Sequence, residues 1–211
     1  MTDPPPIRQV YDRIGEHFSK TREYPWTDVT DFLDDQSGAV GLDVGCGNGR
    51  HTEALAEAVD RPVGVDLSRT LLEEAQRRAA DRAVATTYLQ GTATALPVAT
   101  GVADLGLYVA AIHHLRSRTA RIQSLDELAR VLAPGGTALV SSWSTAHDTF
   151  DREQAFETTV DWTLPDGETV PRYYYIYDPE TFAVDLAESA LVVESRWVSS
   201  GNNYARVSPR R

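Results

Sequence analysis

Three closely spaced glycines give this chain a loop that could hold a ligand. Gly45, Gly47 and Gly49 lie between an apolar run, residues 39–42, which predicts a short buried strand, and residues 50–59, which predict a helix. A strand that turns through glycines into a helix presents free backbone N–H groups and the positive end of the helix dipole. Glycine is needed because the backbone turns tightly and the ligand lies directly against it.

Two acidic residues lie at the ends of the strands predicted beside this loop. Asp43 precedes the first glycine by two positions, and Asp66 ends the apolar run of residues 63–66, where it could accept both hydroxyls of a ribose. A dinucleotide fingerprint would need its third glycine at position 50, which is Arg50. The run from Asp43 to Gly49 instead resembles the first motif of class I S-adenosylmethionine (SAM) methyltransferases. There the carboxylate orients the cofactor and the glycines admit its amino-acid and ribose portions. A generic strand–turn–helix junction and an imperfect nicotinamide site are the alternatives.

Methyl transfer from a sulfonium is a displacement at carbon, so the enzyme mainly aligns donor and acceptor in a dry pocket. An amine or hydroxyl acceptor needs a base, and His113 or His114 could serve. A carboxylate acceptor needs no base at neutral pH, and an arginine fork such as Arg22 or Arg172 would hold it. Each histidine could equally cap a helix, and Arg22 could pair with an acid instead.

Aromatic residues are concentrated near the same strand ends. Trp143 ends a predicted strand, residues 137–143, where its indole could stack on a base or belong to the core. The run Tyr173-Tyr174-Tyr175-Ile176-Tyr177 is typical of an amphipathic strand with alternate rings free. The residues expected around the reacting groups are Arg22, His113, His114, Trp143, Arg172 and Tyr173. Those expected around SAM are Asp43, Gly45, Cys46, Gly47, Asn48, Gly49, Asp66, Leu67, Thr92, Ala93 and Ala110.

Alternating strands and helices must position these residues. The pattern predicts a Rossmann-like α/β domain over residues 1–211, with a doubly wound, mostly parallel seven-stranded sheet and an antiparallel terminal hairpin. Residues 1–36 contain two helices that should lie over the cofactor. Residues 144–171 show no strong period and predict an insertion near the substrate site. Further strands are expected at 84–90, 102–108, 137–143, 191–199 and 204–207, and further helices at 7–18, 27–33, 68–82, 117–132 and from Asp178-Pro179 onward.

Composition limits the class of protein. The length of 211 residues and the hydrophobic share of 42% suffice for one α/β domain with a core. No apolar run approaches a membrane span, and the opening residues do not resemble a signal peptide. The single cysteine, Cys46, excludes an internal disulfide and a four-cysteine zinc site. We therefore expect a cytoplasmic protein without a membrane segment or a bound metal.

The charge is unusual as well. The net charge is −11, and all of the 20 basic residues except Lys20 are arginine. An acid excess with almost no lysine is typical of proteins adapted to concentrated salt, although a GC-rich genome also favours arginine. Nucleic-acid binding favours a basic surface, so the charge argues against an RNA substrate. Screening by concentrated salt would weaken that argument.

Taken together, the motifs resemble the tRNA methyltransferases that esterify carboxymethyl-uridine at the wobble position. The most specific part is His17-Phe18-Ser19-Lys20-Thr21-Arg22, followed by Pro25-Trp26. The resemblance implies a carboxylate acceptor on tRNA, with Arg22 and the histidines near the reacting groups. The match runs from Val10 to Val207 and is completed by the glycine run, His113-His114, Trp143, Arg172 to Tyr174 and a hairpin near Asn203.

The resemblance also implies a partner, a small zinc-binding activator shared by several methyltransferases, and hence a heterodimer. The predicted strand from Val84 to Gln90 should be a sheet edge, and it has no charge or proline that would blunt it. Such an edge can pair with an added strand. The alternative is that residues 144–171 cover it.

Two features depart from the family pattern. Thr92 stands where many class I enzymes have an acid that contacts the adenine amino group, and residues 144–171 lack the basic low-complexity segment of eukaryotic relatives. Two other functions therefore stay open. One is a small-molecule methyltransferase acting on a carboxylate, quinone or phenol, and the other is a SAM-binding subunit without turnover of its own.

Overall fold

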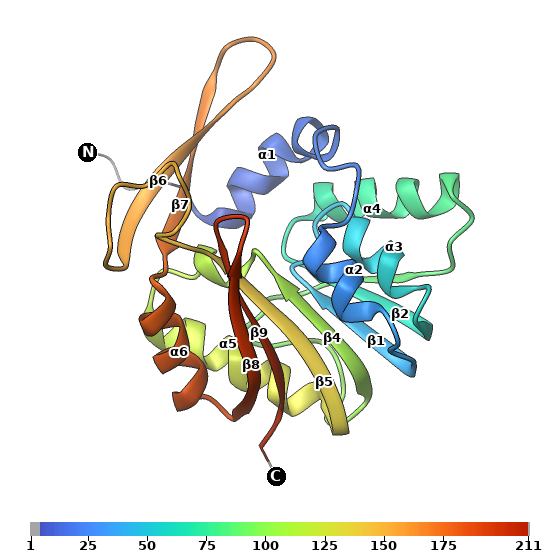
Figure 1. Cartoon of the computed structure of the whole chain (residues 1–211). Helices are drawn as coiled ribbons and strands as arrows, with labels where there is room; N and C mark the ends of the chain where they lie inside the picture. Colours follow the sequence, from blue (N-terminus) through green and yellow to red (C-terminus); the bar gives the residue numbers. More distant parts are fainter. Residues whose placement is uncertain (1–4, 211) are drawn as a thin grey trace.

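The structure of the chain, a computed structural model, describes residues 5–210 (Figure 1). Within that range seven strands form one sheet in the order β3-β2-β1-β4-β5-β9-β8, and β6 and β7 form a separate hairpin. The helices are α1 (Ile7–Ser19), α2 (Thr27–Leu33), α3 (Arg50–Leu55), α4 (Arg69–Asp81), α5 (Arg118–Val131) and α6 (Pro179–Glu188), with a 3₁₀ turn η1 (Ile112–His114). The strands are β1 (Gly38–Val44), β2 (Val59–Asp66), β3 (Thr87–Gln90), β4 (Ala103–Val109), β5 (Leu132–Trp143), β6 (Phe156–Thr163), β7 (Thr169–Ile176), β8 (Leu191–Ser199) and β9 (Asn202–Pro209).

The sheet is doubly wound, as predicted. Strand β1 pairs in parallel with β2 on one side and β4 on the other, so the strand order reverses beside β1. Strands β3 and β5 extend the parallel part, while β9 is antiparallel to β5 and to β8. In sheets of this kind, ligands bind beyond the carboxyl ends of the strands at the point of reversal. The loop with Gly45 and the end of β4 both lie at that point.

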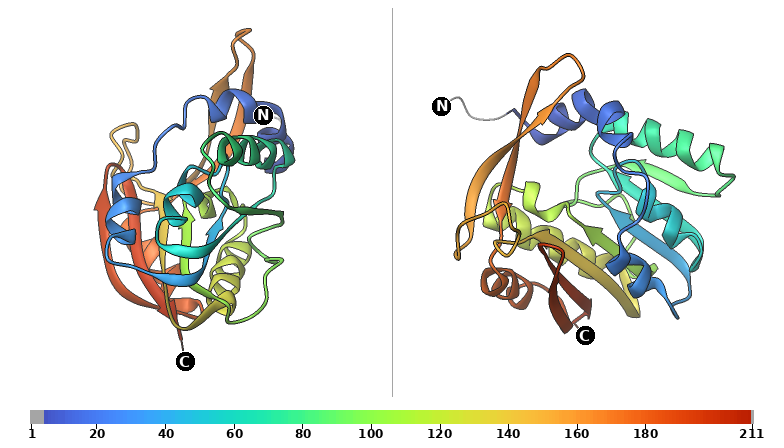
Figure 2. Two further views of the ribbon diagram at one scale, coloured as in Figure 1. Left: turned by 90° about the vertical axis from the view of Figure 1, so that its right-hand side faces the viewer. Right: turned by 45° about the horizontal axis from the view of Figure 1, so that its top comes forward.

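Helices cover both faces of the sheet (Figure 2). Apolar residues of α2 and α3, among them Phe32 and Leu55, pack on one face with Leu107 of β4. Leu128 of α5 and Phe182 of α6 pack on the other face. Burial of both faces explains why the parallel strands consist of nearly continuous apolar runs.

Side-chain caps fix the start of the main helices. The Ser68 hydroxyl accepts from the Leu71 N–H at 3.2 Å and caps α4. The Asp178 carboxylate accepts from two backbone N–H groups at the start of α6, where Pro179 occupies the first helical position. Both helix starts match the prediction from the sequence.

Residues 144–171, predicted as an insertion without a strong period, contain strands that the sequence did not predict. Strand β6 and the start of β7 form a hairpin that projects from the body of the molecule (Figure 1). Inward residues of β6 such as Val160 and Trp162 alternate with exposed polar residues, so the apolar content is too low to stand out as a strand. Gly167, with φ +87°, supplies the turn that Pro165 and Asp166 begin.

Several predicted boundaries shift. The strand expected from Val84 to Gln90 is paired only over Thr87–Gln90, although it is the sheet edge, as predicted. Strand β5 begins at Leu132, five residues before the predicted Thr137, because Ala103 of β4 already pairs with Leu132. Asn202 and Asn203, expected in a turn, belong to β9.

The N-terminal helices have separate places. Helix α1 lies across the carboxyl ends of the strands and contacts α4 and β7 (Figure 1). Helix α2 packs against α3 on one face of the sheet. Of the two helices, therefore, only α1 contributes to the roof described below. None of the helices in residues 5–210 has the length and apolarity that a bilayer crossing requires.

Candidate active site

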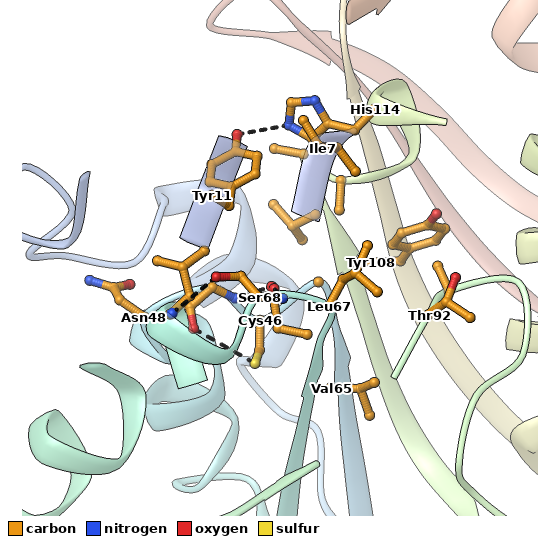
Figure 3. Close-up of a pocket in the computed structure, with 18 of the residues that line it drawn as sticks. Ile7, Tyr11, Cys46, Asn48, Val65, Leu67, Ser68, Thr92, Tyr108 and His114 are labelled. Carbon is orange, nitrogen blue, oxygen red and sulfur yellow. Dashed lines mark hydrogen bonds between the residues drawn. The ribbon is translucent and has the colours of Figure 1, made fainter. Parts of the chain in front are cut away.

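The glycine loop forms the floor of a cavity, which we call the loop cavity (Figure 3). Its other walls come from the end of β2, the segment after β3, the end of β4 and helix α1. Nine of the eleven residues predicted around a cofactor line it: Gly45, Cys46, Gly47, Asn48, Asp66, Leu67, Thr92, Ala93 and Ala110. Asp43 and Gly49, the other two predicted residues, do not line this cavity.

The three glycines have different physical roles. All three have positive φ angles, 71° at Gly45, 54° at Gly47 and 78° at Gly49, which residues with a side chain rarely adopt. A Cβ atom on Gly45 would lie 2.5 Å from the Ala111 Cβ, and one on Gly49 would lie 2.4 Å from the Tyr88 hydroxyl. A Cβ atom on Gly47 would have no protein atom within 4 Å. Gly45 and Gly49 therefore allow close packing, whereas Gly47 leaves open space in the cavity.

Asp66 fixes the loop from the end of β2. One carboxylate oxygen accepts from the Gly47 N–H at 2.8 Å and the other accepts from the Ser68 N–H at 2.8 Å. Each oxygen keeps a further lone pair on the cavity side. Burial raises the pKa of Asp66, and these two backbone bonds oppose the rise.

Asp43 lies beneath the loop, outside the cavity. Its side chain is 1% exposed and accepts a hydrogen bond of 2.7 Å from the Thr52 hydroxyl of α3. Burial raises the pKa of Asp43 to about 7, although the Thr52 bond lowers it. Asp43 was predicted to orient the cofactor. In the structure its carboxylate instead joins β1 to α3 and does not line the loop cavity. Burial also raises the pKa of the neighbouring Cys46 thiol well above its usual value.

Helix α1 is the roof of the loop cavity. Ile7, Tyr11 and Phe18 line the cavity from this helix, and Figure 3 shows Ile7 and Tyr11 above the loop. Asp12 anchors the roof, because it accepts a hydrogen bond of 2.8 Å from the Ser68 hydroxyl. The helical spacing predicted α1, but it gave no sign that Tyr11 faces a site instead of the core.

A second cavity, which we call the arginine cavity, adjoins the first. Tyr11, Phe18, Arg50, Ala110 and His114 line both cavities and form the boundary between them. The predicted residues Arg22, His113, Trp143 and Arg172 also line the arginine cavity, together with Tyr174. The structure thus brings together side chains from α1, η1, β5 and β7 that are far apart in the sequence.

Two arginines converge in this cavity without an acidic partner. Among residues 5–210, no carboxylate forms an ion pair with Arg22 or Arg172. The buried Nε–H of Arg172 also has no hydrogen-bond acceptor there. Arg172 is 6% exposed, and its guanidinium lies between the rings of Trp162, at 5.1 Å, and Tyr174, at 5.2 Å. Burial and the charge of Arg172 lower the pKa of Arg22. Arg50 and one acid, Asp28, also line the cavity, so three arginines outnumber one carboxylate and an added anion would neutralise the excess positive charge.

The two histidines are held in neutral forms. The backbone N–H of Trp143 donates to His113 Nδ1 at 3.0 Å, so the ring proton of neutral His113 is on Nε2. His114 Nδ1 donates to the Tyr173 carbonyl at 3.0 Å, and Nε2 accepts from the Tyr11 hydroxyl at 2.9 Å (Figure 3). Burial lowers the pKa of His114 to about 4 and that of His113 well below its usual value. Both nitrogens of His114 are occupied, which makes it a poor candidate for a base.

The prediction for Tyr173 needs correction. Its ring lies outside the arginine cavity, and its hydroxyl donates to the Arg116 carbonyl at 3.3 Å. Alternation along β7 places Tyr174 on the face with Arg172, so Tyr174 takes the position predicted for Tyr173. The Tyr174 ring lies 5.0 Å from that of Trp143 and 4.9 Å from that of His113. The sequence predicted the strand but not which of its two faces lines the arginine cavity.

A strap, residues 19–26, lines the arginine cavity and is held by hydrogen bonds from the glycine loop. The Asn48 amide of the glycine loop donates to the Arg22 carbonyl at 2.9 Å and to the Ser19 carbonyl at 3.3 Å. Arg50 donates to the Tyr24 carbonyl at 3.2 Å and stacks over the Trp26 ring. The loop that lines one cavity therefore positions the segment that carries an arginine of the other.

Known proteins of similar sequence include methyltransferases. The methyltransferase domain family matches residues 42–140. A tRNA (carboxymethyluridine(34)-5-O)-methyltransferase of Mus musculus is 36% identical over 139 residues, which cover 65% of this chain and 20% of the mouse protein. A protein of Encephalitozoon cuniculi named "Putative methyltransferase" is 33% identical over 184 residues, covering 82% of this chain and 81% of that protein. The chain thus spans about a fifth of the mouse relative but most of the microsporidian one.

Solved structures agree on the fold. A SAM-dependent methyltransferase from Clostridium acetobutylicum superposes with a TM-score of 0.74 at 15% identity, covering 95% of this chain and 99% of that one. The Haloferax volcanii methyltransferase in a complex with the Trm112 methyltransferase activator has a TM-score of 0.71 at 15% identity, with 97% and 98% coverage. SAM is the cofactor of this class of enzymes. The chain therefore belongs to the methyltransferases, has the fold of the SAM-dependent enzymes, and is similar in sequence to the tRNA (carboxymethyluridine(34)-5-O)-methyltransferases.

Proposed function

We propose that this chain transfers a methyl group from SAM to the carboxylate of a carboxymethyl-uridine at the wobble position of tRNA. The observation that carries the proposal is the pair Arg22 and Arg172, which converge without an acidic partner in a cavity that adjoins the glycine loop. Paired guanidinium groups bind a carboxylate with charge-assisted hydrogen bonds. The names of the relatives support the same substrate.

The residues of the loop cavity fit the cofactor. Gly47 leaves open space where a side chain would lie, and Asp66 keeps lone pairs for the ribose hydroxyls beside the backbone bonds that hold it. Apolar Leu67 and Ala93 suit an adenine ring. The backbone N–H groups of Gly45, Cys46, Gly47 and Gly49, expected to be free, all donate to acceptors within the protein. When bound, SAM supplies a methyl group on a cationic sulfur.

The arginine cavity suits a reaction without a base. A carboxylate oxygen forms a bond to the methyl carbon while the carbon–sulfur bond breaks, and the electron pair of that bond stays on sulfur. No proton moves, which agrees with the occupied nitrogens of His114 and the low pKa of both histidines. Arg22 and Arg172 orient the carboxylate, and the rings of Trp143 and Tyr174 exclude water and offer faces to the uracil.

We further propose that a small zinc-binding activator docks on the outer edge of β3. Strand β3 ends the sheet, so no strand within residues 5–210 lies beside Thr87–Gln90 on the side that faces away from β2. An added strand could pair there. The structure of the Haloferax volcanii methyltransferase with its activator supports the idea that this fold accepts such a partner.

Labelled SAM and tRNA from a strain lacking the gene test the proposal. The purified chain, with and without the activator, should place label on tRNA as an ester that alkali releases. Label found only on small carboxylates, quinones or phenols would favour a small-molecule methyltransferase instead. Tight SAM binding without any product would indicate a subunit without turnover. Arg22→Ala should lower transfer much more than SAM affinity, and equal loss of both would place Arg22 at the cofactor.

A further inference from the structure

Trp162, on the hairpin that projects from the sheet, contacts both arginines of the arginine cavity. The Cζ atom of Arg172 lies 5.1 Å from the centre of its ring, and that of Arg22 lies 5.8 Å away. Both distances are within the range of cation–π attraction, for which tryptophan has the strongest ring. The sequence gave no reason to single out this residue.

Local structure explains how one ring reaches two cations. On the hairpin, Val160 of β6 pairs with Arg172 of β7, and Trp162 pairs with Val170. Trp162 is therefore the diagonal neighbour of Arg172 on the same face, which is within reach of a long side chain. Arg22 arrives from the strap after α1, and its guanidinium also lies 4.8 Å from the Phe18 ring.

The ring itself is held in place from α1. The Trp162 Nε1–H donates to His17 Nδ1 at 3.1 Å, and the ring lies 5.3 Å from that of Phe18. One edge of the indole is thus fixed by a hydrogen bond, while its π surface is presented to the guanidinium groups. This arrangement ties the hairpin to the helix that roofs the loop cavity.

The charge balance shows what such a ring can do. Two guanidinium groups close together repel each other, and proteins ordinarily hold them with a carboxylate. A carboxylate placed there would occupy the same hydrogen-bond donors that a substrate anion needs. An indole face attracts the cations without using any N–H donor, so the Arg172 Nε stays without a protein partner.

We propose that Trp162 is a positioning residue, a π platform that holds Arg22 and Arg172 together without occupying any of their N–H donors, which an anionic substrate needs. Arg22 Nη1 donates to Thr21, whereas Arg172 Nε has no hydrogen-bond partner among the described residues. This inference rests on the proposed function for the identity of that anion, a carboxylate attached to a pyrimidine. It assigns to the hairpin a part in substrate binding that is separate from its contribution of Arg172.

Calorimetry with 5-carboxymethyluridine tests the platform, using the whole chain saturated with S-adenosylhomocysteine. Trp162→Leu should weaken nucleoside binding about tenfold or more, as expected for losing two cation–π contacts, and Trp162→Phe should lose less. Affinity for S-adenosylhomocysteine should stay within about twofold. Trp197→Phe is a control for the loss of an indole, because no arginine among residues 5–210 stacks on Trp197 and a phenyl ring can keep the stack on Tyr204, which lines the arginine cavity.

Fluorination of the ring separates cation–π attraction from simple packing. The chain is produced with mono-, di- and trifluorinated tryptophan, in wild-type and Trp162→Phe forms, so that the other tryptophans are labelled equally in both. Nucleoside affinity should fall stepwise with each fluorine in the wild type and less in the Trp162→Phe form. Equal slopes in the two forms would overturn the platform, even if Trp162→Leu binds weakly.

A further measurement keeps the platform testable if the wild-type chain binds no 5-carboxymethyluridine, which would count against the proposed function. The side-chain Nε–H signals of Arg22 and Arg172 should be displaced by the ring current of the indole and should move toward ordinary arginine values in Trp162→Leu. Unchanged signals in a folded variant would overturn the platform whatever the substrate is.

Discussion

The two cavities meet at one wall but are built in different ways. The loop cavity takes most of its lining from short segments at the ends of β1, β2, β3 and β4, and each segment follows its strand directly. The arginine cavity takes Arg22 from the strap and Arg172 from the hairpin, both outside the seven-stranded sheet, while Asp28 of α2 and the shared Arg50 also line it. The first is therefore a property of the sheet, whereas the second depends on how outlying segments fold back onto it.

Because the two cavities are built from different parts of the chain, cofactor binding and acceptor binding should be separable by mutation. A change in the sheet should affect the loop cavity and stability together, because the same backbone serves both. A change in the strap or the hairpin should affect acceptor binding alone. The predictions below test that separation.

The largest effect is expected from Arg172→Ala. Removing a buried guanidinium that binds the acceptor carboxylate should lower kcat/KM about 10²- to 10³-fold, the range found for losing one partner of a buried charge pair. Arg172→Lys should recover little, because an ammonium lacks the planar fork. SAM affinity, measured by calorimetry, should change less than about threefold. A parallel loss of SAM affinity would mean that the two cavities are not separable.

Gly47→Ala should be next, with a loss confined to the cofactor. Its Cβ would meet no protein atom within 4 Å but would occupy the loop cavity, so the dissociation constant for S-adenosylhomocysteine should rise about tenfold or more. The cost to stability should be only about 1 kcal/mol, from the positive φ angle. Gly101→Ala is the control. Gly101 has a φ of +69° and no atom within 4 Å of an added Cβ, but it lines neither cavity.

Gly45→Ala should differ from Gly47→Ala in its effect on stability. Its Cβ would lie 2.5 Å from the Ala111 Cβ, so this variant should lose stability as well as cofactor binding, by about 2–3 kcal/mol in the free energy of unfolding. Urea titration of the three alanine variants gives the order. A Gly45→Ala protein as stable as the Gly101→Ala control would contradict the packing assigned to this glycine.

Asp43 should give stability an unusual pH dependence. Its pKa is raised by burial from 3.8 to about 7, so the folded state holds a proton that the unfolded state has released between those values. The stabilising contribution is complete below about pH 4 and is lost as the pH rises to about 7, on the order of a few kcal/mol. In Asp43→Asn, the urea midpoint of unfolding should vary less with pH across this range. If the midpoint still falls with pH as steeply as in the wild type, another group is responsible.

The smallest effect is expected for the pH dependence of the transfer step. Burial lowers the pKa of His114 to about 4, and a carboxylate acceptor needs no base, so kcat should be flat between about pH 6 and pH 8. His114→Gln should leave that profile flat. A rise of kcat with an apparent pKa near 6.5, abolished in this variant, would show that a histidine acts as base and that the acceptor is not a carboxylate.

The sequence predicted most of the lining of both cavities, and the residues that it missed were missed for a physical reason. Gly45 to Gly49 act through local backbone conformation, and Asp66 is placed by the end of its own strand, so short stretches of sequence were enough. Tyr11 and Trp162 have helical or alternating spacing that a core residue would share, and only the fold shows that they face a site. Tyr173 and Tyr174 could not be distinguished, because a shift of one residue reverses the faces of a strand.

The strap and the hairpin also bear on how such enzymes diversify. The methyltransferase domain family matches residues 42–140, which include the glycine loop but neither Arg22 nor Trp162 nor Arg172. The parts that we propose to bind the acceptor thus lie on both sides of the segment that the family shares. If they do bind it, exchanging these flanking pieces would change the acceptor without altering the glycine loop.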